Sequence, residues 1–82
     1  MKMITEITRG HVRMQFGDKT VTVEGEGYAR GYGSPDFVAY KNSIQKWDPP
    51  FDATPIDEST RIQILADLAA EMLEKGMTIE IE

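Results

Sequence analysis

Residues 12–23, VRMQFGDKTVTV, contain two short runs of alternating apolar and polar side chains on either side of Gly17 and Asp18. Alternation with a period of two is typical of strands that bury one face. A glycine also tolerates the positive φ that a tight turn between two such strands requires. We therefore predict a β-hairpin over these residues, and the expected fold is built outward from it.

Two other segments have the composition of strands. Residues 3–8, MITEIT, combine apolar and β-branched side chains, which predicts a strand before the hairpin. Residues 77–82, MTIEIE, alternate as the hairpin does and predict a strand at the end of the chain. The pattern does not decide which edge of the sheet this last strand joins, so the strand order stays open.

A first helix is expected over residues 35–47. Ser34 can cap it with its hydroxyl, Pro35 suits the first helical position, and Asp36 suits the positive end of the helix dipole. Pro49 disfavours a helical conformation in the residue before it and so ends the helix. Large side chains recur at helical spacings of three and four: Phe37, Tyr40, Ile44 and Trp47.

A second, longer helix is expected from Asp57 or Glu58 to Lys75, with Gly76 as the left-handed residue after its end. The side chains expected to face the core are Ile62, Leu65, Leu68, Ala69, Met72 and Leu73. Those expected on the opposite side are Gln63, Asp67, Glu71 and Glu74, with Ile64 at the border. This second group is either a solvated face or a partner-binding face.

Together these elements predict a single domain over residues 1–82 of the α+β class. The expected architecture has two layers: an antiparallel sheet of the N-terminal strands, the hairpin and the C-terminal strand, with two helices on one face. The chain has no cysteine, no apolar leader at its N-terminus and no uncharged stretch long enough to cross a bilayer. A cytoplasmic location is therefore expected.

Acidic residues are concentrated in the second half of the chain. The formal net charge is −5, and residues 48–82 carry two basic residues against nine acidic ones. Such a field repels nucleic-acid phosphates and attracts basic proteins over a Debye length of about 8 Å at physiological salt. We expect a basic protein partner and neither a nucleic acid nor a membrane, although acidity can also serve solubility alone.

Catalytic and cofactor motifs are poorly supported. The glycine-rich residues 25–33 follow a strand, but Arg30 stands where a dinucleotide-binding turn needs its third glycine. His11 is the only histidine and has no ligand-spaced partner, so no metal and no cofactor are expected. A small hydrolase or isomerase that uses His11, Glu24 and Glu26 remains the enzymatic alternative, and we expect no enzyme.

The central run GYGSPDFVAY at residues 31–40 is distinctive, as is WDPPF at residues 47–51. With ITRG at residues 7–10 and GMTIE at residues 76–80, these motifs resemble the immunity protein 74 family of bacterial polymorphic toxin systems. The resemblance covers nearly the whole chain. It implies a cytoplasmic protein, made beside a toxin, that binds the toxin domain and protects the producing cell. The family motifs include no set of catalytic residues.

Aromatic and acidic residues at exposed positions are the expected contacts with such a toxin, because rigid aromatic side chains dominate binding hot spots and carboxylates steer basic partners. The partner is expected to be a basic toxin domain, a nuclease, that the chain blocks sterically and electrostatically. A regulatory module that binds an endogenous basic protein is the alternative, and a toxin-encoding neighbouring gene would separate the two. The expected partner-binding residues are Tyr32, Trp47, Asp48, Ile64, Asp67, Glu71 and Glu74.

Overall fold

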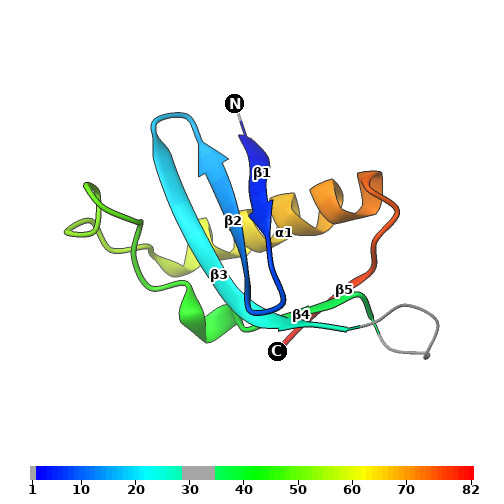
Figure 1. Cartoon of the computed structure of the whole chain (residues 1–82). Coiled ribbons are helices and arrows are strands. Elements are labelled where there is room, and N and C mark those ends of the chain that lie inside the picture. Colours follow the sequence, from blue (N-terminus) through cyan, green and yellow to red (C-terminus); the bar gives the residue numbers. More distant parts are fainter. Residues whose placement is uncertain (1, 29–34) are drawn as a thin grey trace.

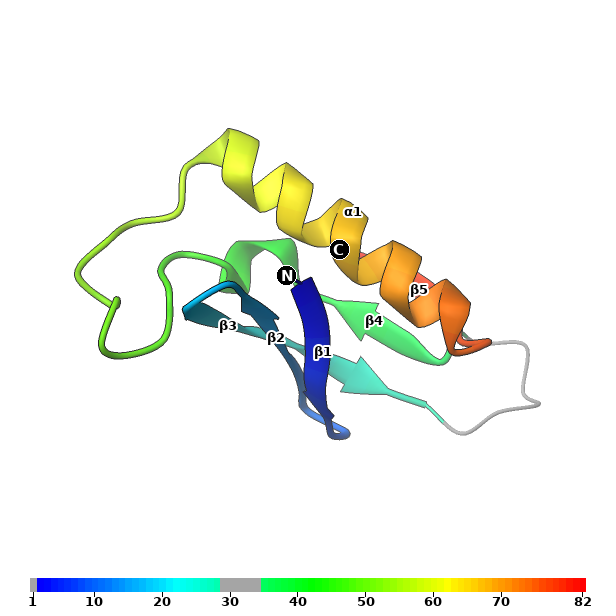
Figure 2. The same cartoon turned by 90° about the horizontal axis from the view of Figure 1, so that it is seen from above.

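A computed structural model describes residues 2–28 and 35–82 of the chain. Its described part has one α-helix, which lies across one face of a five-stranded sheet (Figures 1 and 2). The elements in chain order are β1 (Lys2–Ile7), β2 (His11–Phe16), β3 (Lys19–Gly27), β4 (Phe37–Ala39), the 3₁₀ turn η1 (Lys41–Ser43), α1 (Glu58–Glu74) and β5 (Ile79–Ile81).

The predicted hairpin is confirmed as β2 and β3. The two strands pair antiparallel with Met14 opposite Val21, and Gly17 takes a positive φ of 65° in the turn between them. The strand expected before the hairpin is also present: β1 pairs antiparallel with β2 and has an irregularity between Ile4 and Glu6. Such an irregularity interrupts an exposed strand edge and discourages pairing with other chains.

The helix expected over residues 35–47 is wrong. Residues 37–39 form the short strand β4, and a single 3₁₀ turn follows at residues 41–43. All three side chains of β4 are buried, so this short interior strand does not show the alternation of a half-exposed strand. Ser34, the expected cap, lies outside the described residues.

The expected antiparallel sheet with two helices is therefore corrected to a mixed sheet with one helix in the described chain, although the α+β class holds. The strand order is β1-β2-β3-β4-β5, so the C-terminal strand lies at the β4 edge. It pairs parallel with β4, with Val38 opposite Glu80. A parallel pair needs a long crossover connection, and α1 lies within that connection.

The predicted bounds of the long helix are confirmed, but its orientation is not. Asp57 caps α1 by accepting a hydrogen bond from the Thr60 amide at 2.7 Å. Leu65, Leu68 and Met72 are buried as expected, but the helix is rotated about its axis relative to the expected orientation. Ile62 and Leu73, which were expected in the core, are 60% and 74% exposed, whereas Ile64 is 1% exposed.

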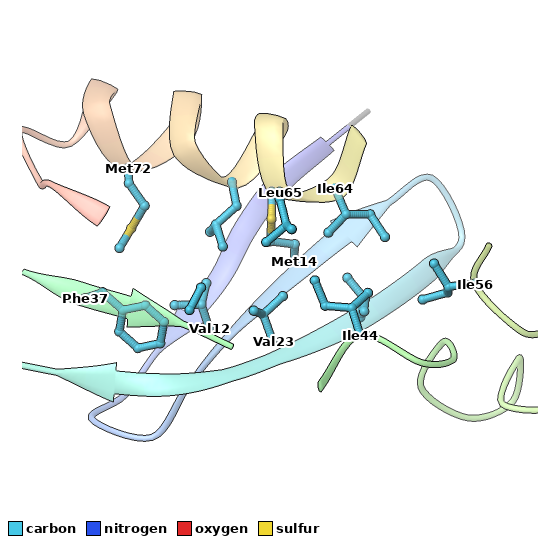
Figure 3. Close-up of a cluster of buried hydrophobic side chains, with 12 residues drawn as sticks. Val12, Met14, Val23, Phe37, Ile44, Ile56, Ile64, Leu65 and Met72 are labelled. Carbon is cyan, nitrogen blue, oxygen red and sulfur yellow. The ribbon is translucent and has the colours of Figure 1, made fainter. Parts of the chain in front are cut away.

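The core lies between α1 and the helix-facing side of the sheet (Figure 3). It takes alternate residues from each hairpin strand, which is why the hairpin pattern is readable in the sequence. Its fully buried large side chains are Phe37, Met14, Ile44, Ile64, Leu68, Met72, Val12, Val21 and Val23.

Gly25 allows β3 and β4 to approach each other closely. A Cβ atom at this position would lie 2.0 Å from the carbonyl oxygen of Val38 and 2.7 Å from the Phe37 ring. Real Cβ atoms do not tolerate such contacts, so any other residue would force the two strands apart. The relative placement of β3, β4 and β5 therefore depends on this glycine.

Candidate partner-binding surface

One face of the sheet is not covered by α1, and its β3–β5 half carries a compact group of acids and tyrosines. In β3, Glu24 and Glu26 alternate with core residues and so point away from the helix. Val38 of β4 lies opposite Glu26 on one side and opposite Glu80 of β5 on the other. Residues directly opposite in neighbouring strands share a face, so these side chains lie together.

Two tyrosines are fixed on this face by one carboxylate. Tyr28 follows the end of β3 and Tyr40 follows β4, and both hydroxyls donate to Oε2 of Glu26, at 2.9 and 3.1 Å. The two residues are 43% and 38% exposed, whereas Val38 of β4, which lies opposite Glu26, is buried. The rings are thus held in place and still present area to solvent.

The shared carboxylate raises the pKa of both phenols. For Tyr28 and Tyr40 the main cause is the hydrogen bond to Glu26, because ionising a phenol beside a carboxylate loses that bond and adds repulsion. The charge of Glu82 also raises the pKa of both tyrosines. Both tyrosines therefore stay neutral donors around neutral pH.

We call this group the acidic tyrosine surface. It comprises Glu24, Glu26, Tyr28, Val38, Tyr40, Glu80 and Glu82. Within residues 2–28 and 35–82, no Lys, Arg or His forms an ion pair with any of its four side-chain carboxylates. The surface is therefore strongly negative.

The β1–β2 half of the same face has the opposite character, because its charges are paired with each other. The Glu6 carboxylate accepts hydrogen bonds from Nε2 of His11 at 2.8 Å and from Nη1 of Arg13 at 3.3 Å. The hydrogen bond from His11 and the charge of Arg13 lower the pKa of Glu6. Arg13 also lies 3.8 Å from Asp48, which accepts a hydrogen bond from the Thr22 hydroxyl at 2.8 Å.

Trp47 and Asp48, two of the expected partner-binding residues, fall on opposite faces of the sheet. Trp47 is half-buried against the core and meets Phe16 edge to face, with ring centroids 6.0 Å apart. Lys19 places its ammonium 5.8 Å from the Trp47 ring. Asp48 instead joins the charge network around Arg13. Both residues are thus engaged within the fold and do not form one exposed site.

The acidic face expected on α1 is not formed as a continuous surface. Ile64 is a core residue, and Asp67 is buried, with hydrogen bonds from Nζ of Lys2 at 2.8 Å and from Gln63 at 3.1 Å. Glu71 is half-buried and Glu74 is exposed. Tyr32, the remaining expected contact, lies outside the described residues.

An open depression of about 550 Å³ lies where the loop before β2 approaches the start of β4. Ile7, Phe37 and Met77 give it an apolar lining, and Thr8 and Arg9 are among its polar groups. Among the described residues, its lining includes one carboxylate, Asp36, and no histidine.

The residues of the enzymatic alternative share one face of the sheet, where His11 lies opposite Glu24, but none of them lines the depression. His11 is bonded to Glu6, Glu26 holds the two tyrosines, and the exposed side chain of Glu24 lies outside the depression. Across the described residues, no three His, Asp or Glu side chains are placed to hold a metal ion. No helix in the described ranges is long and apolar enough to cross a membrane.

Comparison with known proteins adds one decisive match. The family model of Immunity protein 74 matches residues 4–82, which is nearly the whole chain. The chain belongs to the immunity protein 74 family. No curated protein and no solved structure matches it.

Membership of the immunity protein 74 family supports an immunity role in which the chain binds a cognate toxin, and it points to a non-enzymatic function. The acidic tyrosine surface was not among the residues expected from sequence. Tyr40 was assigned to a helix face, and the acids of β3 were considered only for catalysis. The available signal was the alternation of Glu24, Glu26 and Tyr28 along one strand, which places all three on one face.

Proposed function

We propose that this chain neutralises a toxin domain by forming a tight protein complex with it, in the cytoplasm of the cell that makes it. The observation that carries this proposal is the family match over residues 4–82. The charge networks and hydrogen-bonded tyrosines described above support a binding role. Protection follows from occlusion of the toxin and requires no reaction.

We further propose that the toxin is a nuclease. An enzyme that cleaves nucleic acid presents basic side chains to phosphates, and the net charge of −5 on this chain complements such a surface. Electrostatic attraction of this kind raises association rates to as much as about 10⁸–10⁹ M⁻¹s⁻¹ at low salt. Fast capture suits a protein that must inactivate a toxin before it reaches its target.

The direct test is co-expression with the toxin domain encoded by the neighbouring reading frame. Expression of the toxin domain alone should stop growth, and co-expression with this chain should restore it. The two proteins should then co-purify at a fixed stoichiometry. Growth arrest that persists at a high level of folded, soluble chain would contradict the proposal.

The nuclease assignment is tested separately with the purified toxin domain. Nucleic acid incubated with the domain should be cleaved, and one equivalent of the chain should abolish the cleavage. A toxin domain that binds the chain but leaves DNA and RNA intact would refute the nuclease assignment and leave the immunity role standing.

A further inference from the structure

We propose that the acidic tyrosine surface is the docking site for the toxin, and that its occupant is a protein surface rich in Lys and Arg. The inference rests on the proposed immunity function and deepens it by naming the contact surface. The uncovered side of β3, β4 and β5 offers two fixed, exposed aromatic rings beside four carboxylates that have no ion-pair partner among the described residues.

Charge favours this surface over the outer side of α1. Ile62 and Leu73 give the helix two exposed apolar groups, but its acids Glu58 and Asp67 are already paired with Arg61 and Lys2. The four carboxylates of the acidic tyrosine surface have no basic ion-pair partner in the described chain. A basic partner therefore gains more attraction at the sheet than at the helix.

The tyrosines suit a role at the centre of the interface. Tyrosine is enriched at binding hot spots, where its ring excludes water and its hydroxyl forms a directed hydrogen bond. Here the bonds from both hydroxyls to Glu26 hold the rings before any partner arrives. A side chain that is already ordered loses less conformational entropy on binding, which lowers the cost of association.

The same features define the chemistry of the partner. An Arg guanidinium can stack on an exposed tyrosine ring and at the same time bond a neighbouring carboxylate. Glu26 and Glu80 lie on either side of Val38, so hydrogen-bond acceptors are present on both sides of this buried valine. The surface therefore fits a protein patch with at least two closely spaced Arg or Lys side chains.

The test compares two matched double variants for affinity to the toxin domain from the neighbouring reading frame. Tyr28→Gln with Tyr40→Gln removes the two rings of the proposed surface. Ile62→Gln with Leu73→Gln removes the two exposed apolar groups of α1 by the same chemical change. We expect the tyrosine variant to bind at least about 100-fold more weakly, and the helix variant to stay within about 3-fold of wild type.

Each result has one interpretation. Equal affinity of the tyrosine variant and wild type, or a larger loss in the helix variant, would overturn the docking site while the immunity function stands. Failure of the wild-type chain to bind the toxin domain at all would instead refute the proposed function. A free chain that dimerises through the tyrosines, with dimerisation lost in the tyrosine variant, would name a second copy as occupant and also overturn the proposal.

A second measurement needs no substitution and so does not depend on whether the variants fold. Hydroxyl radicals should oxidise Tyr28 and Tyr40 in the free wild-type chain, because both rings are exposed and this reaction does not require an ionised phenol. In the toxin complex, oxidation of these two positions should be lost, as read by mass spectrometry of the digested chain. Undiminished oxidation of both tyrosines in the complex would overturn the docking site.

Discussion

The two halves of the sheet face that α1 leaves uncovered both carry acidic side chains, but they differ in how these acids are paired. In the β1–β2 half, Glu6 is bonded to His11 and Arg13, so its charge is balanced inside the molecule. In the β3–β5 half, Glu26 accepts hydrogen bonds from two neutral tyrosine hydroxyls and has no ion-pair partner among the described residues. Acidity alone therefore does not distinguish the two halves, whereas the presence of a cationic partner within the described chain does.

The largest expected effect comes from separating the strands that build the β3–β5 half. Gly25→Ala places a methyl group against the Val38 carbonyl and the Phe37 ring, so we expect the free energy of unfolding to fall by about 3 kcal/mol or more. Urea denaturation followed by circular dichroism measures this loss.

Gly10→Ala is the matched control, because nothing lies within 4 Å of the added Cβ atom at Gly10. Its unfolding free energy should stay within about 0.5 kcal/mol of wild type. If Gly25→Ala were as stable as Gly10→Ala, the close approach of β3 and β4 would not be a requirement of the fold.

The second prediction concerns association kinetics. Glu24→Lys with Glu80→Lys reverses two charges on the acidic tyrosine surface, and we expect the association rate with the toxin domain to fall by about 10-fold or more at low salt. The difference from wild type should shrink as salt is added, because screening removes long-range attraction. Stopped-flow mixing at several salt concentrations measures both effects.

Asp52→Lys with Glu74→Lys is the control with the same change of net charge at exposed positions elsewhere. Its association rate should fall by no more than about 3-fold, since only the overall charge has changed. An equal loss in both double variants would mean that net charge, and no particular surface, steers the toxin.

A smaller effect is expected in the charge-paired half. Arg13→Met removes the cation that lies between Glu6 and Asp48. Because these side chains are partly exposed and water can replace lost bonds, the unfolding free energy should fall by only about 0.5–1 kcal/mol. Toxin affinity should not change, and a loss of affinity at full stability would place the β1–β2 half in the interface.

The smallest effect is on proton affinity. Glu26→Gln removes the carboxylate that raises the pKa of Tyr28 and Tyr40, so both phenols should ionise at lower pH than in wild type. In wild type, the raised pKa stabilises the fold below the ordinary tyrosine pKa, and this contribution is lost as the pH rises through the folded value. Ultraviolet titration of phenolate absorbance measures the shift, and identical curves would contradict the hydrogen-bonded pair.

At low pH, the protonation of Glu6 should change the stability in the opposite direction. His11 and Arg13 lower the pKa of Glu6, so its contribution to stability is complete above the ordinary Glu value and is lost as the pH falls through the lowered one. Glu6→Gln should flatten the fall of Tm below about pH 5. An unchanged slope in this variant would show that the pair contributes nothing to acid stability.

Sequence reasoning found the elements whose evidence is local. The hairpin alternates with a period of two around Gly17, and α1 has an Asp57 cap and ends before Gly76, so both were predicted with their bounds. The rotation of α1 was missed because the apolar arc of the helix is wider than its buried face, so that Ile62 and Leu73 are exposed while Asp67 is buried. The contact that hides Asp67 comes from Lys2, 65 residues away, and such a contact leaves no local pattern.

Residues 35–47 were misassigned because both the capping residues at 34–36 and the spacing of the large side chains favour a helix, which the tertiary structure does not allow. The spacing of Phe37, Tyr40 and Ile44 suits a helix, whereas residues 37–39 are needed as an interior strand between β3 and β5. Sheet pairing and full burial outweigh a weak helical preference over so short a segment. The acidic tyrosine surface was missed for the same reason, since it exists only when β4 joins the sheet.

The most direct test of the binding account is a nitrogen-15 NMR titration of the labelled chain with the unlabelled toxin domain. If the toxin docks on the acidic tyrosine surface, the largest amide changes will occur at residues 24–28, 38–40 and 80–82, with residues 62–73 of α1 nearly unchanged. Changes concentrated on α1, with the three sheet segments unaffected, would contradict it.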